Sequence, residues 1–262
     1  MQPLTLILRT AGTNCDQELA HAFELAGAAT QTLHLNELIK DPARIDRFDL
    51  IGFPGGFSYG DDIAAGRIFA NRLRHHLYEP LKGAIARGVP MIGVCNGFQV
   101  LAKLGLLPEP DGAGNGRQTV TLADNACGRF IDRWVKLEAQ ADSVCVWTRG
   151  LSRLELPIAH GEGRFVPESD AVLERIKQNR QIALRYAAED NPNGSTDNIA
   201  GVCDPTGLVL GLMPHPERFI HPTNHPQWTR QSAQWMSETP AGLRFFQNAV
   251  EQVSSKATLA VG

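Results

Sequence analysis

The sequence predicts an α/β fold with an open, mostly parallel central sheet, helices on both faces of that sheet, and antiparallel additions. In the first hundred residues, short apolar or β-branched runs alternate with helical patterns, as in βαβ units whose sheet is covered on both sides. From about Gly105, β-rich segments joined by turn sequences replace this alternation, which indicates antiparallel strands.

The first elements follow from local patterns. Leu4–Leu8 is apolar and predicts the first strand. Asn14 or Asp16 can cap a helix that runs to about Ala26, because apolar residues recur there at i, i+3, i+4 and i+7, and Gly27 is the stop signal. Two further short apolar or β-branched runs, Thr30–Leu35 and Leu50–Phe53, predict the next two strands.

A Gly-rich loop and a long helix are expected next. The loop covers Pro54–Asp62, and the helix runs from Ile63 to about Arg87, where Gly88 ends it. Val89–Val94 is short and continuously apolar, which is typical of a central strand buried on both faces.

The second half of the chain is predicted to add antiparallel strands. Arg129–Leu137 and Val144–Thr148 are β-rich segments. Asp204–Gly207 is a turn sequence between two apolar runs, Ile199–Cys203 and Leu208–Met213, which is typical of a hairpin.

Composition and charge exclude several classes of protein. Hydrophobic residues make up 43% and charged residues 20% of the chain, which is normal for a globular protein. The 25 Lys and Arg against 28 Asp and Glu give a net charge of −3, without the basic excess that nucleic acid or anionic lipid would require. We therefore expect a cytoplasmic protein without a membrane span or signal peptide, formed by one domain over residues 1–262, with a loop at 219–240 and a last helix over about 241–253.

One of the five cysteines has distinctive neighbours. No CxxC pair is present, which argues against a disulfide framework or a zinc cluster. Cys95 lies between Gly93 and Gly97 where a predicted strand meets a helix, the Gly-x-nucleophile-x-Gly form of a nucleophile elbow. A helix N-terminus stabilises a thiolate and offers free N–H groups to an oxyanion. The alternative is a buried cysteine in an ordinary Gly-flanked turn.

A base for this nucleophile is expected in the segment Pro214-His215-Pro216-Glu217, which follows a predicted strand. The prolines favour an extended backbone, in which residues i and i+2 point the same way. Glu217 would then orient His215 toward Cys95, in the manner of a catalytic triad. A structural histidine in a Pro-rich loop is the alternative.

The loop that begins at Pro54 is the candidate oxyanion loop. It should face the same crevice as Cys95, because ligands of open α/β sheets bind at the carboxyl ends of the strands. We expect the N–H of Gly56 or Phe57 to join the N–H of Asn96 as the oxyanion hole. A phosphate-binding loop is the alternative, but the Lys and Ser/Thr of a P-loop and the GxGxxG spacing are absent.

Together these motifs resemble class I (triad-type) glutamine amidotransferases, which have a flavodoxin-like α/β fold. Four segments are further similar to the glutaminase subunits of phosphoribosylformylglycinamidine synthases. The resemblance extends from residue 4 to about 218, resumes at the terminal helix, and is carried by residues 8–16, 55–61, 157–165 and 213–218.

The resemblance implies a reaction and its partners. Cys95 would attack the side-chain amide of glutamine to give a thioester and ammonia, with His215 moving the proton, Glu217 holding His215, and Gln99 facing the amino-acid end of the ligand. No cofactor or metal is implied for this chain. ATP and Mg are expected on a synthetase partner that converts formylglycinamide ribonucleotide to the amidine, and a small accessory subunit is expected to bridge the two.

Two further segments each allow two interpretations. His160-Gly161-Glu162-Gly163 could be an acid/base pair or a metal fragment, but two ligands argue against a metal, so we expect a structured loop near the glutamine pocket or the partner face. Trp228 and Trp235 in the 219–240 loop could anchor a partner or pack onto the terminal helix.

Two other functions remain open at this point. One is a free-standing thiol hydrolase of the same fold, of the γ-glutamyl hydrolase or peptidase type. The other is a catalytically silent regulatory module. The loops at 55–61 and 157–165 argue against the first, and the presence of Cys95, His215 and Glu217 argues against the second.

Overall fold

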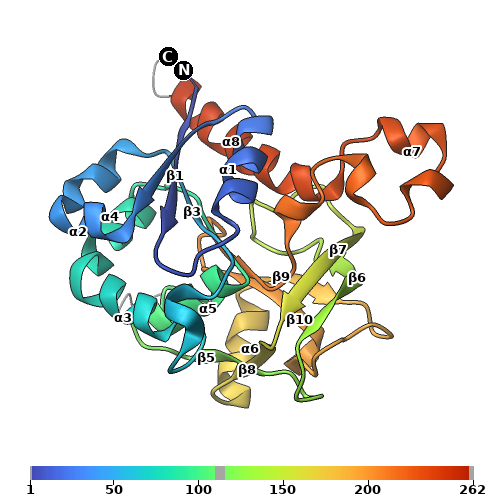
Figure 1. Ribbon diagram of the computed structural model, residues 1–262, viewed down its shortest axis with the longest axis horizontal. Coiled ribbons are helices and arrows are strands. Elements are labelled where there is room, and N and C mark those ends of the chain that lie inside the picture. The colour runs from blue at the N-terminus through green and yellow to red at the C-terminus, as the bar shows by residue number, and fades with distance from the viewer. Residues whose placement is uncertain (1, 110–115, 260–262) are drawn as a thin grey trace.

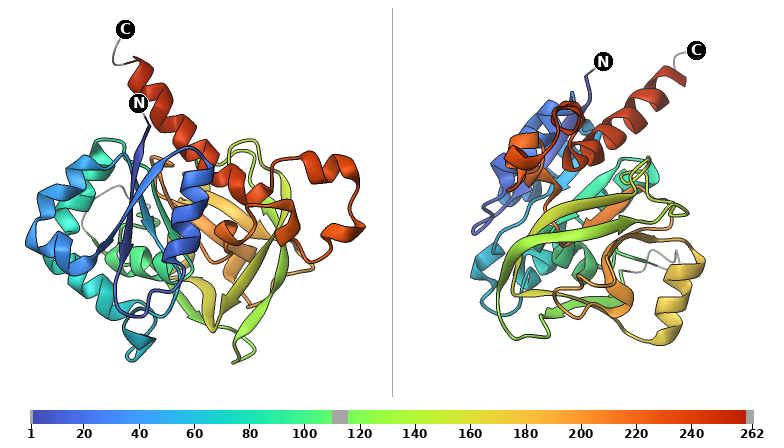
Figure 2. Two further views of the ribbon diagram at one scale, coloured as in Figure 1. Left: turned by 45° about the horizontal axis from the view of Figure 1, so that its top comes forward. Right: turned by 90° about the vertical axis from the view of Figure 1, so that its right-hand side faces the viewer.

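A nine-stranded sheet with helices on both faces forms the centre of the molecule (Figure 1). The computed structural model describes residues 2–109 and 116–259. The strand order is β2-β1-β3-β4-β11-β10-β9-β6-β7, and a separate two-stranded sheet pairs β5 with β8. Both termini lie at the same end of the molecule (Figure 2). This arrangement confirms the predicted α/β fold with a parallel sheet and antiparallel additions.

The first five strands of this order run parallel to one another. The last three of these five strands are buried along their whole length, as their continuous apolar runs predict. The bounds of the five are β1 (Leu4–Arg9), β2 (Ala29–His34), β3 (Leu50–Phe53), β4 (Met91–Val94) and β11 (Val209–Leu212).

The remaining strands of the large sheet pair in antiparallel fashion. One hydrophobic core continues through both halves of the sheet. The bounds are β10 (Ile199–Cys203), β9 (Ile182–Tyr186), β6 (Ile131–Ala139) and β7 (Arg153–His160), with β5 (Val120–Asp124) and β8 (Glu162–Pro167) in the small sheet.

Helices cover the parallel half from both sides. Gly52 of β3 faces Leu19 and Phe23 of α1, whereas the next residue, Phe53, packs against Gly97 of α5. The C-terminal helix α8 lies beside α1 (Figure 2). The bounds are α1 (Asp16–Leu25), α2 (Leu35–Lys40), α3 (Arg67–His76), α4 (Tyr78–Ala86), α5 (Asn96–Leu104), α6 (Asp170–Gln178), α7 (Ala233–Ser237) and α8 (Ala241–Leu259).

The long helix expected over residues 63–87 is wrong, because two helices, α3 and α4, occupy this region. They meet at Leu77, whose φ of −129° and ψ of 4° are not helical. Pro80 explains the break, since it has no N–H to donate to the carbonyl of His76 and its ring would crowd that carbonyl in a continuous helix.

The strand expected at Val144–Thr148 is also wrong, because this segment is a buried loop. Trp147 is fully buried, and its indole N–H donates to the carbonyl of Leu208 at 2.8 Å. The N–H of Val146 donates to the carbonyl of Gly207 at 3.0 Å. The apolar composition therefore reflects burial of side chains rather than pairing in a sheet.

Two further segments differ in detail from expectation. The last helix continues to Leu259, beyond the expected end near Val253. The segment 219–240, expected to be a loop, contains the short helix α7, whose first turn is capped by the Ser232 hydroxyl accepting from the N–H of Trp235 at 3.1 Å. Within residues 2–109 and 116–259, no helix combines the length and apolar character needed to cross a membrane.

Candidate active site

Cys95 lies in the tight turn between β4 and α5. Its φ of 52° and ψ of −104° fall in a region that non-glycine residues rarely adopt. A Cβ atom at Gly93 would lie 2.7 Å from the carbonyl oxygen of Gly97, and one at Gly97 would lie 2.0 Å from that of Phe53. Only glycine fits on either side, so the turn has the geometry of a nucleophile elbow.

His215 and Glu217 reach the same edge of the sheet, because they follow β11, the parallel neighbour of β4. Nδ1 of His215 lies 2.7 Å from Oε1 of Glu217, and both side chains are buried. The predicted pair is therefore present, but the predicted extended backbone is wrong. Pro216–Arg218 forms a 3₁₀ turn, which places the carboxylate beside the ring.

The surroundings of His215 favour a positively charged ring. Burial lowers the pKa of its imidazole, but the Glu217 carboxylate and then the thiols of Cys15 and Cys95 raise the pKa well above its usual value. Nε2 is buried and has no hydrogen-bond partner among the described residues. Because the acceptor Glu217 keeps the proton on Nδ1, Nε2 is the nitrogen that can exchange a proton with Cys95 or a ligand.

Two backbone N–H groups near Cys95 are candidates for an oxyanion hole. The N–H of Asn96 belongs to the first turn of α5, where N–H groups have no partner within the helix. The N–H of Gly56 makes no backbone hydrogen bond to the described residues, whereas the N–H of Phe57 donates to the carbonyl of Gly12 at 2.9 Å. Of the two loop donors that the sequence predicts, Gly56 is free and Phe57 is occupied.

The side chain of Asn96 connects this loop to α5. Its Oδ1 accepts from the N–H of Ser58 at 3.3 Å, and its Nδ2 donates to Asp61 at 3.2 Å and to Oε1 of Gln99 at 2.9 Å. Nε2 of Gln99 donates to the carbonyl of Glu162 at 2.6 Å. The network fixes the positions of both candidate N–H donors relative to Cys95.

These elements surround a cavity of about 690 Å³, a size suited to a small metabolite. Most of the predicted site residues line it. Glu217 lies behind His215, and Asn96 contributes its backbone and the network just described. The lining residues predicted from the sequence are Gly56, Phe57, Cys95, Gln99 and His215.

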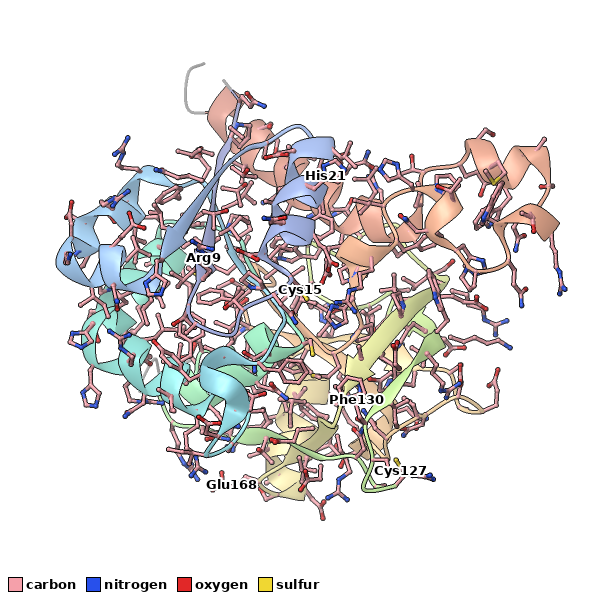
Figure 3. All side chains as sticks on the ribbon, viewed as in Figure 1. Arg9, Cys15, His21, Cys127, Phe130 and Glu168 are labelled. Carbon is pink, nitrogen blue, oxygen red and sulfur yellow. The ribbon has the colours of Figure 1, made fainter. Side chains whose placement is uncertain are left out.

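The sequence reasoning assigned no role to Cys15, which lies at the start of α1 and lines the same cavity (Figure 3). Ligand atoms of Cys15, His215 and Glu217 all lie within 4.8 Å of one another, so in the described part of the chain this group could hold a metal ion. The guanidinium of Arg218 donates to Sγ of Cys15 at 3.2 Å. Cys15 follows β1 at the carboxyl edge of the parallel strands, and this position is the sequence signal that could have indicated its place in the site.

His160 is a second buried imidazole in the cavity, at the end of β7. Its Nδ1 lies 3.0 Å from Oδ1 of Asn125, which also accepts from the N–H of Gly163 at 3.3 Å. Nδ1 therefore carries the proton, and Nε2 is left without a partner among the described residues. Burial, and then the nearby His215, lower the pKa of His160 to about 4, so the ring is neutral at pH 7.

An open α/β sheet with a cysteine at a nucleophile elbow, and a His–Glu pair after the neighbouring parallel strand, defines a triad-type glutamine amidotransferase domain. The chain belongs to the family of CobB/CobQ-like glutamine amidotransferase domains, which matches residues 2–253.

Individual relatives cover nearly the whole chain. The chain is 44% identical over 256 residues to the phosphoribosylformylglycinamidine synthase subunit PurQ of Dehalococcoides mccartyi, covering 94% of this chain and 96% of that protein. It is 39% identical over 268 residues to the PurQ subunit of Methanococcus maripaludis strain C5, covering 96% and 98%. Among solved structures, PurLQS from Thermotoga maritima contains a chain with a TM-score of 0.74 and 30% identity, covering 96% of this chain and 99% of that one.

Proposed function

We propose that this chain is the glutaminase subunit of a phosphoribosylformylglycinamidine synthase. The observation that carries the proposal is the arrangement of Cys95 at the elbow with the buried His215–Glu217 pair at the same sheet edge. Within the amidotransferase class, the choice of this enzyme is supported by curated relatives at 39–44% identity that match nearly end to end. The chain is thus an enzyme of the glutamine amidotransferase type.

Cys95 begins the reaction as the nucleophile. Its sulfur attacks the side-chain amide carbon of glutamine, and the N–H groups of Gly56 and Asn96 stabilise the resulting oxyanion. His215 donates a proton from Nε2 to the departing nitrogen, so ammonia leaves and a thioester remains. The net result of this step is the exchange of the C–N bond for a C–S bond.

Water completes the reaction. His215, now neutral at Nε2, accepts a proton from the water that attacks the thioester carbon, and the same two N–H groups hold the second oxyanion. Glutamate is released and the thiol of Cys95 is restored. Glu217 keeps the proton on Nδ1 throughout, which holds the imidazole in the tautomer that both steps need.

The amino-acid end of glutamine is proposed to bind near Gln99, whose carboxamide lines the cavity and is held by Asn96 and the carbonyl of Glu162. Neither step needs a cofactor or metal from this chain. ATP and Mg²⁺ are proposed to bind the synthetase subunit, which uses the ammonia to convert formylglycinamide ribonucleotide to formylglycinamidine ribonucleotide. Five free cysteines fit the reducing cytoplasm as the compartment.

The synthetase is proposed to dock over the mouth of the cavity, with a small accessory subunit bridging the two proteins. Phe57 and Phe130 line the cavity, lie with their ring centroids 6.4 Å apart, and leave 47% and 54% of their surfaces exposed. Ile63 in the adjacent loop is 65% exposed. Exposed aromatic groups at a cavity mouth favour a protein interface, which would also keep ammonia from solvent.

Glutamine hydrolysis by the wild type and by Cys95→Ala, with and without the synthetase, tests the proposal. We expect measurable glutaminase activity in the wild type, stimulation by the synthetase, and loss of activity in the variant. Cys127→Ala is the matched control, because Cys127 is exposed and outside the cavity. Unchanged activity in Cys95→Ala would contradict the mechanism. High activity that ignores the synthetase, or hydrolysis of γ-glutamyl peptides, would favour a free-standing thiol hydrolase instead.

A further inference from the structure

One carboxylate in the candidate site has no role in the proposed reaction. Asp61 belongs to the loop that begins at Pro54, and it lines the same cavity as Cys95 and Gln99. Its φ of 52° lies in the left-handed region that non-glycine residues rarely adopt. The fold therefore holds this side chain in place at some cost in backbone strain, which is typical of residues that contact a ligand.

The Asp61 carboxylate is held through one of its two oxygens. Oδ1 accepts from the N–H of Gly66 at 3.0 Å and from Nδ2 of Asn96 at 3.2 Å. Within residues 2–109 and 116–259, Oδ2 has no hydrogen-bond partner and the carboxylate forms no ion pair. One oxygen thus fixes the side chain, and the other remains able to bind a group in the cavity.

The side chain of Asn96 brings Asp61 next to Gln99. Its Nδ2 donates to Oδ1 of Asp61 and also to Oε1 of Gln99 at 2.9 Å, so the two oxygens are neighbours around one nitrogen. A carbonyl oxygen has two lone pairs, and Oε1 therefore keeps one for a further donor. Because Asn96 directly follows Cys95, these acceptors are fixed relative to the nucleophile.

The electrostatic environment of Asp61 favours a cationic ligand group. Burial raises the pKa of its carboxyl, and the two hydrogen bonds and the charge of Lys103 offset this effect only in part. A positive charge brought by a ligand stabilises a carboxylate of this kind. The other carboxylates that line the cavity are exposed, except that of the half-buried Glu162. Glu162 contacts Gln99 through its backbone carbonyl, whereas Asp61 shares a side-chain donor with Gln99.

We propose that Asp61 binds the α-ammonium group of glutamine, with Oε1 of Gln99 as a second acceptor. The inference rests on the proposed function, because that function supplies the ligand. The α-carbon of glutamine is three bonds from the amide carbon, so this contact holds one end of the substrate while Cys95 attacks the other. The ion pair is present before and during the reaction, so it lowers KM and has little effect on kcat.

Kinetics with glutamine and with glutaramate, which is glutamine without its α-amino group, test the assignment in the presence of the synthetase. The wild type should prefer glutamine by about 100-fold or more in kcat/KM, because glutaramate leaves the binding group unpaired. In Asp61→Asn, KM for glutamine should rise at least tenfold with kcat within about threefold, and the preference should fall to about tenfold or less. Partial misfolding would lower both rates together and leave their ratio unchanged.

Three further variants separate the charge of Asp61 from its surroundings. Asp61→Glu keeps the charge and should discriminate better than Asp61→Asn. Glu162→Gln removes the other half-buried carboxylate, and Asp62→Asn removes an exposed carboxylate of the same loop that does not line the cavity. Both should keep the preference of the wild type. Equal preference in the wild type and Asp61→Asn, or loss of the preference in Glu162→Gln, would overturn the proposal.

A binding measurement separates this inference from the proposed function. Calorimetry should show that Cys95→Ala, which is expected not to hydrolyse glutamine, binds it at least tenfold more tightly than Cys95→Ala combined with Asp61→Asn. If the wild type hydrolyses no glutamine with the synthetase present while binding depends on Asp61 in this way, the function is contradicted and the assignment stands. Hydrolysis by the wild type together with equal glutamine affinity in the two calorimetry samples would contradict the assignment alone.

Discussion

Two cavities of nearly equal size lie on this molecule, one of about 690 Å³ at the carboxyl edge of the parallel strands and one of about 650 Å³ between the segment 219–240 and strands β6 and β7. Each contains a histidine bonded to a glutamate. In the first, His215 and Glu217 are buried and Nε2 of the ring has no partner among the described residues. In the second, both ring nitrogens of His225 have partners, Glu155 at 3.0 Å and the N–H of Gln227 at 3.2 Å.

The comparison indicates that cavity volume alone does not distinguish a candidate active site. Buried polar groups without hydrogen-bond partners and a strained backbone do. Among the described residues, the first cavity contains a cysteine with strained backbone, two N–H groups without a backbone partner, and two imidazoles that each have one nitrogen without a partner. In the second, the ring of His225 packs against Trp134, Phe219 and Trp235 at centroid distances of 4.8, 5.8 and 5.6 Å. Its polar and aromatic groups satisfy one another, as in a structural cluster.

The largest effect is expected when the two histidine–glutamate pairs are broken one at a time by substitution of the histidine. His215→Asn should lower kcat/KM for glutamine by about 10³-fold or more, which is about 4 kcal/mol of transition-state stabilisation, because it removes the proposed proton carrier of both steps. His225→Asn, the matched variant in the other cavity, should stay within about twofold of the wild type. Steady-state kinetics with the synthetase present measure both.

Comparable losses in the two variants would remove the distinction between the cavities. Circular dichroism and thermal unfolding of each variant separate a catalytic loss from a folding defect. A folding defect would change the spectrum and the unfolding temperature, whereas a purely catalytic loss would leave both unchanged.

The placement of the candidate triad could be predicted from the sequence because each member lies in a short motif with its own steric or conformational cause. Glycines at 93 and 97 are required by backbone contacts, and the residues around His215 place it after a strand that neighbours β4. The link from Cys15 to His215 spans 200 positions and has no local pattern, so only the assembled sheet edge reveals it. The contact of Asn125, which follows β5, with His160, at the end of β7, likewise has no local pattern in the sequence.

The errors in the fold prediction have a common origin in tertiary context. Apolar residues at Val144–Thr148 were consistent with a strand, but their backbone bonds go to a turn and their burial comes from packing of Trp147. The 3₁₀ turn at Pro216–Arg218 likewise gives the predicted His–Glu contact by a different backbone path. Pro80 is the exception, since the break that it causes between α3 and α4 is visible in the sequence.

A second prediction sharpens the comparison through the pH dependence of stability. The folded-state pKa of His160 is about 4, below its ordinary 6.5, so between these values the unfolded chain binds more protons than the folded one. Stability is therefore complete above about pH 6.5 and falls as the pH drops toward 4. Between pH 7 and pH 5 this group should cost about 2 kcal/mol of the free energy of unfolding.

Urea unfolding of the wild type and of His160→Gln at pH 7 and pH 5 measures this cost. The decrease between the two pH values should be about 2 kcal/mol smaller in the variant. Ser195→Ala is the control, because Ser195 is buried near the same strands, accepts from the N–H of Phe165 at 3.0 Å and does not titrate. Relative to the wild type, Ser195→Ala should lower the free energy of unfolding by the same amount at pH 7 and at pH 5. An identical pH response in His160→Gln and the wild type would contradict burial of a neutral imidazole.

The smallest effect concerns the second cavity and its tryptophans. Trp235 is half-buried, with its ring 6.2 Å from Phe219 and 5.6 Å from His225 between centroids, whereas Trp228 is 41% exposed. Trp235→Ala should lower the free energy of unfolding by about 1–2 kcal/mol, less than a fully buried tryptophan would, and Trp228→Ala by less than about 0.5 kcal/mol. Urea unfolding measures both changes.

Glutamine hydrolysis without the synthetase should stay within about twofold of the wild type in each variant, because neither side chain reaches the first cavity. A large loss of that activity in Trp235→Ala at unchanged stability would mean that the two cavities are coupled, and the segment 219–240 would then belong to the catalytic machinery rather than to the structural cluster around His225.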